Sequence, residues 1–130
     1  MTLKFDPMAK APALMQAWLA ASQTIAASLE PSLVELVRTR ASQIGGPADG
    51  PAMRDAPCYT ARERAALAWT DALARMSGED AREAAYEGIW SHFSAEDQVA
   101  LTLLINVACG WDRLAVGFGV RLEPLRQTAA

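Results

Sequence analysis

Cysteine and histidine are scarce in this chain. Its 130 residues include two cysteines, Cys58 and Cys109, and one histidine, His92. Two cysteines far apart in the sequence do not form a disulfide framework, and a single histidine does not supply the ligand cluster that a metal site needs. We therefore expect neither a metal ion nor a bound cofactor.

A basic surface is also missing. Aspartate and glutamate outnumber lysine and arginine, which gives a formal net charge of −3 and a pI near 5.1. Nucleic-acid binding needs a basic face that neutralises phosphates, so no nucleic-acid partner is expected.

Secretion and membrane signals are equally sparse. Lys4, Asp6 and Pro7 precede the first apolar stretch, which breaks the charged-then-apolar order of a secretory signal. The longest apolar segment, 99–108, has about half the length that crosses a bilayer. These features predict a cytoplasmic protein with no membrane partner.

Sustained period-two alternation is absent, and helical spacing takes its place. Hydrophobic residues make up 52% of the chain, enough for a packed core. We therefore predict an all-α protein, a compact bundle of about five helices in one domain over 1–130. The expected helices cover about 11–29, 31–44, 61–76, 79–91 and 95–118.

Local signals place the helix ends. Pro12 and Pro31 suit first turns, where a missing N–H costs nothing. Thr60 with Glu63 forms a capping box, and Ser94 caps the last helix. A Gly/Pro-rich join, 45–59, separates the second and third helices. The side chains expected to face inward are Leu14, Trp18, Ala21, Ile25 and Leu29, then Leu33, Leu36, Val37, Arg40 and Ile44, then Ala66, Leu67, Trp69, Ala72, Leu73 and Met76, then Ala84, Ala85, Ile89 and Trp90.

Three segments carry a family resemblance: 33–44 (LVELVRTRASQI), 56–76 (APCYTARERAALAWTDALARM) and 93–120 (FSAEDQVALTLLINVACGWDRLAVGFGV). Together they resemble the carboxymuconolactone decarboxylase-like superfamily, in its alkylhydroperoxidase D-type branch. The resemblance covers roughly two thirds of the chain. It implies an all-helical subunit that associates into dimers, trimers or hexamers.

The resemblance also implies a thiol chemistry. Such proteins look like peroxidases in which a Cys-x-x-Cys pair starts a helix, a histidine follows one turn later, and a glutamate in the preceding helix relays protons. A thiolate attacks the peroxide oxygen, and the second cysteine resolves the sulfenic acid. Glu35 matches the relay glutamate by position, and the alternative role is a surface glutamate in a first helical turn.

The cysteine pair and the histidine of that thiol centre are missing from the join, 45–59. On an ungapped match, Pro47 and Gly50 occupy the cysteine positions and Arg54 the histidine position. A competing match aligns 53–57 with a stretch that follows the next helix in the family, so the fold is expected to be shortened by about two helices. A natural degenerate copy, an engineered deletion or an excised segment would each produce this sequence.

The remaining reactive side chains have plain interpretations. Cys58 is a bystander in a loop, and Cys109 is a core residue because buried free cysteine behaves as a small hydrophobe. His92 caps a helix C-terminus. Asp112 and Arg113 form a structural pair or part of an interface. The four tryptophans, Trp18, Trp69, Trp90 and Trp111, are core or subunit-interface anchors.

The function predicted from these residues is that of an oligomeric helical protein without redox cysteines, which is not an active peroxidase. It would act as a homo-oligomer or bind a small apolar ligand. One alternative is a thiol-free acid–base enzyme of the decarboxylase type, in which Glu35 with Arg38 or Arg40 binds an acidic substrate. Another is a peroxidase-family antioxidant protein in its full-length form.

Overall fold

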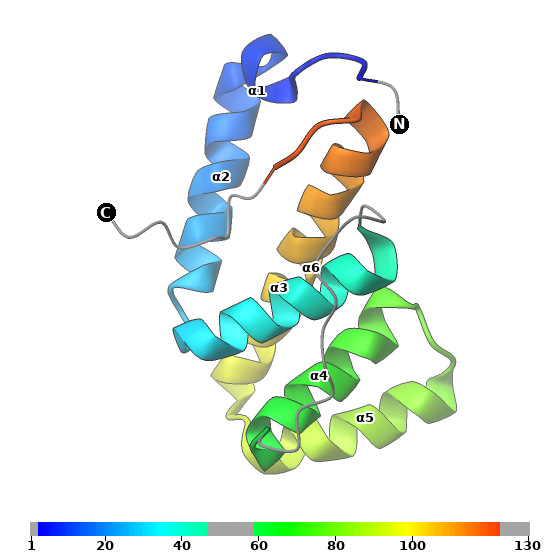
Figure 1. The fold of residues 1–130 in the computed structure, drawn as a ribbon. Helices are drawn as coiled ribbons and strands as arrows, with labels where there is room; N and C mark the ends of the chain where they lie inside the picture. Colours follow the sequence, from blue (N-terminus) through cyan, green and yellow to red (C-terminus); the bar gives the residue numbers. More distant parts are fainter. Residues whose placement is uncertain (1–2, 47–58, 123–130) are drawn as a thin grey trace.

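The computed structural model describes residues 3–46 and 59–122, and all regular structure within these ranges is helical (Figure 1). The all-α prediction is confirmed. The five expected helices match α2 to α6 closely, and one further helix, α1, is a single turn that is too short to leave a periodic pattern. The helices are α1 (Pro7–Lys10), α2 (Pro12–Ala26), α3 (Pro31–Gly45), α4 (Ala61–Ala74), α5 (Glu79–His92) and α6 (Ala95–Phe118).

Helix α6 is the central element. It contacts α2, α3, α4 and α5, with α2 alongside it and α3 crossing it (Figure 1). By length and composition α6 is long and apolar enough to cross a membrane, a property that core helices of soluble proteins share. Its buried side forms the core together with α3. The fully buried large residues there include Leu33, Val37, Leu101, Leu104 and Ile105.

Helix ends follow the predicted chemistry. The Thr60 side chain accepts a hydrogen bond from the Glu63 amide at 3.0 Å, and the Glu63 carboxylate accepts one from the Thr60 amide at 2.8 Å. Ser94 accepts a bond from the Asp97 amide at 3.1 Å. Helix α6 ends at Gly119, whose φ of 72° lies in the left-handed region that glycine adopts without strain.

The end of α4 departs from the sequence expectation. Met76, expected on the buried side, is exposed and has a φ of 51°. The Met76 amide bonds to the Leu73 carbonyl and the Ser77 amide to the Ala72 carbonyl, a Schellman arrangement that needs a left-handed residue. The turn therefore comes before Gly78, and Met76 carries the unfavourable backbone conformation.

Two of the outer helices bury narrower stripes than the periodicity predicts. Leu14 is 75% exposed and Trp90 is 71% exposed, and Ala21 and Ala84 are also exposed. Helix α2 packs on α6, and α5 packs mainly on α4. A helix with one main neighbour buries only the side chains that face it, so residues at the edge of an apolar stripe stay in solvent.

Candidate functional site

The predicted relay residue Glu35 lies on the outer side of α3. Its side chain is 55% exposed and accepts two hydrogen bonds from Arg38, at 2.5 and 3.3 Å. This is an i,i+3 ion pair of the kind that contributes a few tenths of a kcal/mol to a helix, roughly. The relay role of Glu35 stays a prediction.

Arg40, the second predicted substrate-binding arginine, is engaged with α4. Its guanidinium donates to both carboxylate oxygens of Asp71, at 2.5 and 3.1 Å, and to Gln43 at 3.1 Å. A two-pronged arginine–carboxylate contact fixes the relative position of α3 and α4. In this structure Arg40 therefore serves the packing of two helices.

Of the two cysteines, the structure describes Cys109. Cys58 lies outside the described residues. Cys109 is a free thiol in the middle of α6, partly buried and packed against the core, as expected. Burial raises the pKa of its thiol, opposed by the positive charge of Arg113. A raised pKa keeps the sulfur protonated and a poor nucleophile at neutral pH.

One turn along α6, Asp112 is a buried carboxyl. Its Oδ1 accepts a hydrogen bond from the Ser42 hydroxyl at 3.0 Å, whereas its Oδ2 is buried and has no hydrogen-bond partner within 3–46 and 59–122. Gly46 lies against the same group, because a Cβ there would come within 3.2 Å of Asp112 Oδ1. We name Ser42, Gly46, Cys109 and Asp112 the carboxyl cluster.

A cavity of about 50 Å³ adjoins the carboxyl cluster between α3, α4 and α6. Cys109, Asp112 and Arg113 contribute to its lining. Burial raises the pKa of Asp112, and the Ser42 hydrogen bond and the charge of Arg38 counteract it only in part. A buried acid with a perturbed pKa beside a cavity is a candidate for acid–base chemistry. The cavity is far smaller than a pocket for a drug-sized ligand, roughly 300–1,000 Å³.

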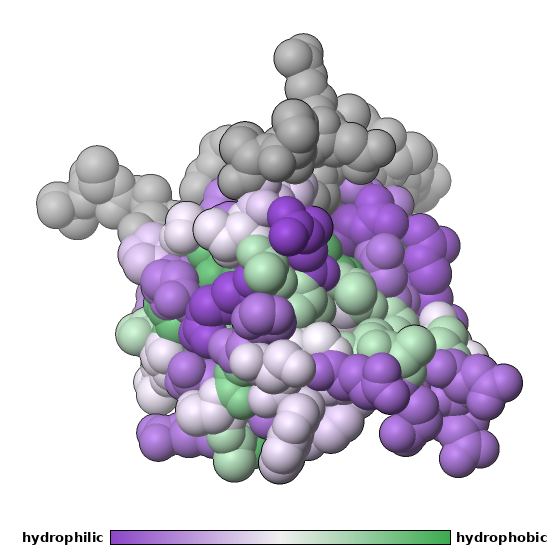
Figure 2. Space-filling view, turned by 90° about the horizontal axis from the view of Figure 1, so that it is seen from below, coloured by the Kyte–Doolittle hydropathy of each residue, from purple (hydrophilic) through white to green (hydrophobic). Residues whose placement is uncertain are grey.

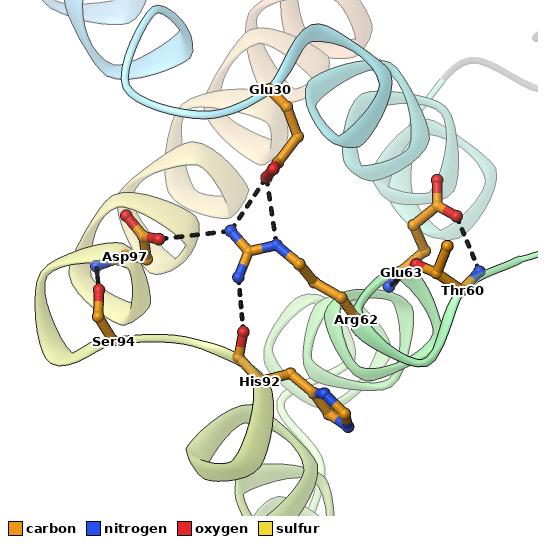
Figure 3. Close-up of polar contacts among 7 residues, drawn as sticks. All are labelled: Glu30, Thr60, Arg62, Glu63, His92, Ser94 and Asp97. Carbon is orange, nitrogen blue, oxygen red and sulfur yellow. Dashed lines mark hydrogen bonds and ion pairs between the residues drawn. The ribbon is translucent and has the colours of Figure 1, made fainter.

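A second polar cluster surrounds Arg62 on α4 (Figure 3). Its guanidinium donates to Glu30 at 3.0 and 3.4 Å, to Asp97 at 3.3 Å and to the His92 carbonyl at 2.5 Å. It also lies 3.9 Å from the ring centre of Phe93. We name these residues the arginine cluster; it ties the start of α3 and α4 to the end of α5 and the start of α6.

His92 takes part in the arginine cluster through its backbone carbonyl. Its exposed imidazole points away from the guanidinium in Figure 3. The expected position at a helix C-terminus is correct, since His92 is the last residue of α5. Across 3–46 and 59–122, no group of three or more His, Cys, Asp or Glu side chains is arranged to hold a metal ion.

A larger groove of about 410 Å³ lies between α4, α5 and α6. Its polar side chains bond to one another and to the backbone. Trp69 donates to Thr102 at 3.0 Å, Tyr86 donates to Gln98 at 2.7 Å, and Gln98 donates to the Phe93 carbonyl at 3.0 Å. The groove therefore presents an almost wholly apolar surface. We name it the α5–α6 groove; its lining is Trp69, Tyr86, Ile89, Ala95, Gln98, Val99, Thr102 and Leu103.

With this geometry in place, a solved structure provides the comparison. A crystal structure from Agrobacterium tumefaciens, of a protein of unknown function described as a candidate antioxidant defence protein AhpD, is 29% identical in sequence. The match has a TM-score of 0.77 and covers 94% of this chain and 100% of the other. No protein-family model matches the chain, and no curated protein matches it in sequence.

The match settles the fold and supports the resemblance. This protein has the all-helical fold of an AhpD-like structure, and the likeness extends over the full length of that neighbour. The expected shortening refers to the longer family pattern with its Cys-x-x-Cys helix, and it stays a prediction.

Sequence reasoning missed the carboxyl cluster. The sequence predicts that Asp112 and Arg113 form a structural pair or part of an interface, and the interface alternative stays a prediction. The hydrogen-bond partner of Asp112 in the structure is Ser42 on α3, and Arg113 is exposed. The available signal was an acidic residue placed directly after an uncharged stretch, 98–111, of a central helix. Aspartate at such a position needs a partner from another helix, because a buried polar group without one is costly.

Proposed function

We propose that this protein is an AhpD-like helical protein of the cytoplasm that forms a homo-oligomer and does not reduce hydroperoxides through a dithiol centre. Its role is that of an oligomeric scaffold. The resemblance in 33–44, 56–76 and 93–120 and the likeness to an AhpD-like structure support the family part of the proposal.

The environment of Cys109 carries the chemical part. A peroxidatic sulfur is typically a thiolate near a helix N-terminus or a cation, with a resolving thiol close by. Cys109 lies in the middle of α6, is partly buried and has a raised thiol pKa. Cys58 is the one other cysteine of the sequence. These features are typical of an inert structural thiol.

A peroxidase assay tests this proposal. The wild-type protein, Cys58→Ser, Cys109→Ser and the double variant are compared for consumption of hydrogen peroxide and of an alkyl hydroperoxide with a small dithiol as reductant. We expect all four proteins to match the uncatalysed rate. Turnover in the wild-type protein that disappears in Cys58→Ser would overturn the proposal.

A thiol-free acid–base enzyme is the second candidate, and Asp112 is the observation that favours it. A carboxyl group with a raised pKa and an unpartnered oxygen is a better proton acceptor than an exposed aspartate. The test is release of carbon dioxide from a carboxylated γ-lactone by the wild-type protein, by Asp112→Asn and by Glu35→Gln. If the wild-type protein releases none above buffer, this candidate is excluded.

A further inference from the structure

The small cavity beside the carboxyl cluster differs in chemistry from the outer surface of the bundle. Seen from below, that surface shows green apolar residues between purple hydrophilic patches (Figure 2). The small cavity instead has an ionisable carboxyl in its wall, that of Asp112, which is only 9% exposed. One oxygen of this carboxyl lacks a hydrogen-bond partner among the described residues. Ionisation at this place is costly, because a buried charge needs hydrogen bonds or water around it.

The neighbour of Asp112 is the carboxyl end of α3. The Ser42 hydroxyl donates to Oδ1 of Asp112 at 3.0 Å, and a Cβ on Gly46 would lie 3.2 Å from the same oxygen. Ser42 lies in the last turn of α3, and that turn holds no basic residue. The free carbonyls at the end of a helix carry partial negative charge, so they disfavour a carboxylate and tolerate a neutral carboxyl. The contact therefore favours the protonated form of Asp112.

The charged groups around Asp112 stabilise its ionised form only in part. Burial raises the pKa of Asp112, opposed by the Ser42 hydrogen bond and by the charge of Arg38 on α3. The Arg38 guanidinium, however, is bonded to Glu35. On α6 itself the Cys109 thiol and the exposed Arg113 line the same cavity, and α4 contributes an uncharged alanine.

The cavity has room for the water that an ionised carboxyl needs. Its volume is about 50 Å³, and one water molecule requires roughly 10–15 Å³. Ile44 and Gly45, in the last turn of α3, form part of its wall. An outward movement of this turn would let solvent reach the free oxygen of Asp112. Just before that turn, Arg40 donates to both carboxylate oxygens of Asp71 on α4, which anchors the rest of α3.

We propose that the Ser42–Asp112 contact is a proton-controlled latch on the carboxyl end of α3. With Asp112 protonated, the last turn of α3 is held against α6. When the carboxyl gives its proton to solvent water, residues 42–46 move outward and water enters the cavity. The Cys109 thiol then becomes reachable from the α3 side. The latch goes beyond the proposed function and does not depend on whether the protein turns over hydroperoxides.

Native-state hydrogen exchange of the full chain tests the latch. Exchange rates divided by the intrinsic rate at each pH give the opening equilibrium of the 42–46 amides. Opening should be constant below about pH 4 and increase about threefold or more by about pH 8, because ionisation favours the open state. Low urea should not change this exchange, because a local opening exposes little surface. Exchange at 42–46 that increases with urea as steeply as exchange in the core of α6 would mark global unfolding and overturn the proposal.

Asp112→Asn removes the group that controls the latch. The amide keeps an oxygen that accepts from Ser42 and does not titrate, so opening of 42–46 should be independent of pH. Asp80→Asn is the matched control, because Asp80 is an exposed carboxyl on α5, and it should keep the wild-type profile. A profile that persists in Asp112→Asn contradicts the latch. If that variant does not fold, a flat wild-type profile or one that Asp80→Asn flattens overturns the proposal.

Alkylation of Cys109 measures the opening of the cavity independently. In a Cys58→Ser background, labelling by iodoacetamide at about pH 7 is compared with and without Asp112→Asn. Burial and, less strongly, the negative charge of Asp112 raise the pKa of the Cys109 thiol, so removing that charge alone would speed labelling. The latch predicts the opposite, a rate about threefold lower in Asp112→Asn, because the wall on the α3 side stays closed. Faster labelling in this variant would overturn the proposed opening.

Discussion

The arginine cluster and the carboxyl cluster are both polar, and they differ in how completely they are satisfied. Arg62 is partly exposed and has acceptors on Glu30, Asp97 and the backbone of His92. Asp112 is buried, and one of its two oxygens has no hydrogen-bond partner among the residues that the structure describes. Polar groups whose hydrogen bonds are all made stabilise the fold. A buried carboxyl with one unbonded oxygen lowers the free energy of unfolding.

Removing the arginine should have the largest effect. Arg62→Ala deletes bonds to three helix ends and the contact with the Phe93 ring, so we expect a loss of about 2 kcal/mol in the free energy of unfolding. Urea denaturation measures it. Arg82→Ala, an exposed arginine on α5, should change stability by less than about 0.5 kcal/mol. Equal effects of the two variants would show that the cluster does not join the helices.

The second-largest loss of stability is expected when the hydrogen-bond partner of Asp112 is removed. Ser42→Ala leaves the buried carboxyl without its hydrogen bond, which should cost about 1–2 kcal/mol at pH 7. Ser28→Ala, an exposed serine bonded to a backbone carbonyl in α2, is the control. In the background of Asp112→Ala, which removes the accepting oxygen, the cost of Ser42→Ala should shrink. An undiminished cost there would mean that Ser42 acts through something other than the carboxyl.

Neutralising the carboxyl should stabilise the protein. Asp112→Asn keeps the shape and the oxygen that accepts from Ser42, and removes a charge that burial disfavours. We expect a gain of about 1 kcal/mol at pH 7 by urea denaturation. A loss of stability would show that the buried amide N–H group, which takes the place of the unpartnered oxygen, costs more than the charge it replaces.

The smallest effect is expected in the pH dependence of stability, which reports on the same buried Asp112 carboxyl. Burial raises the pKa of Asp112 in the folded state, so the folded protein holds this proton more tightly than the unfolded chain does. Its contribution to stability is complete below the ordinary aspartate pKa and is lost as pH rises through the folded value. The difference between wild type and Asp112→Asn should therefore grow from about pH 4 upward in thermal unfolding. A difference that is constant with pH would contradict the raised pKa.

Much of the fold could be predicted from the sequence because its signals are local. The capping box at Thr60 and the prolines that start α2 and α3 depend on neighbours in the chain, and these predictions are confirmed. The exposure of Leu14 and Trp90 could not be predicted, because periodicity reports a helix face and not which neighbour covers it. The Ser42–Asp112 contact joins residues 70 positions apart and left no local trace.

The crowding around Gly46 excludes a side chain where the polypeptide leaves α3. A Cβ at this position would lie 2.7 Å from the Ser42 carbonyl oxygen and 3.2 Å from Asp112 Oδ1. Any residue other than glycine would therefore have to push the last turn of α3 or the Asp112 carboxyl out of place. The space that glycine leaves empty at the end of one helix is what lets a carboxyl from another helix sit beside that end.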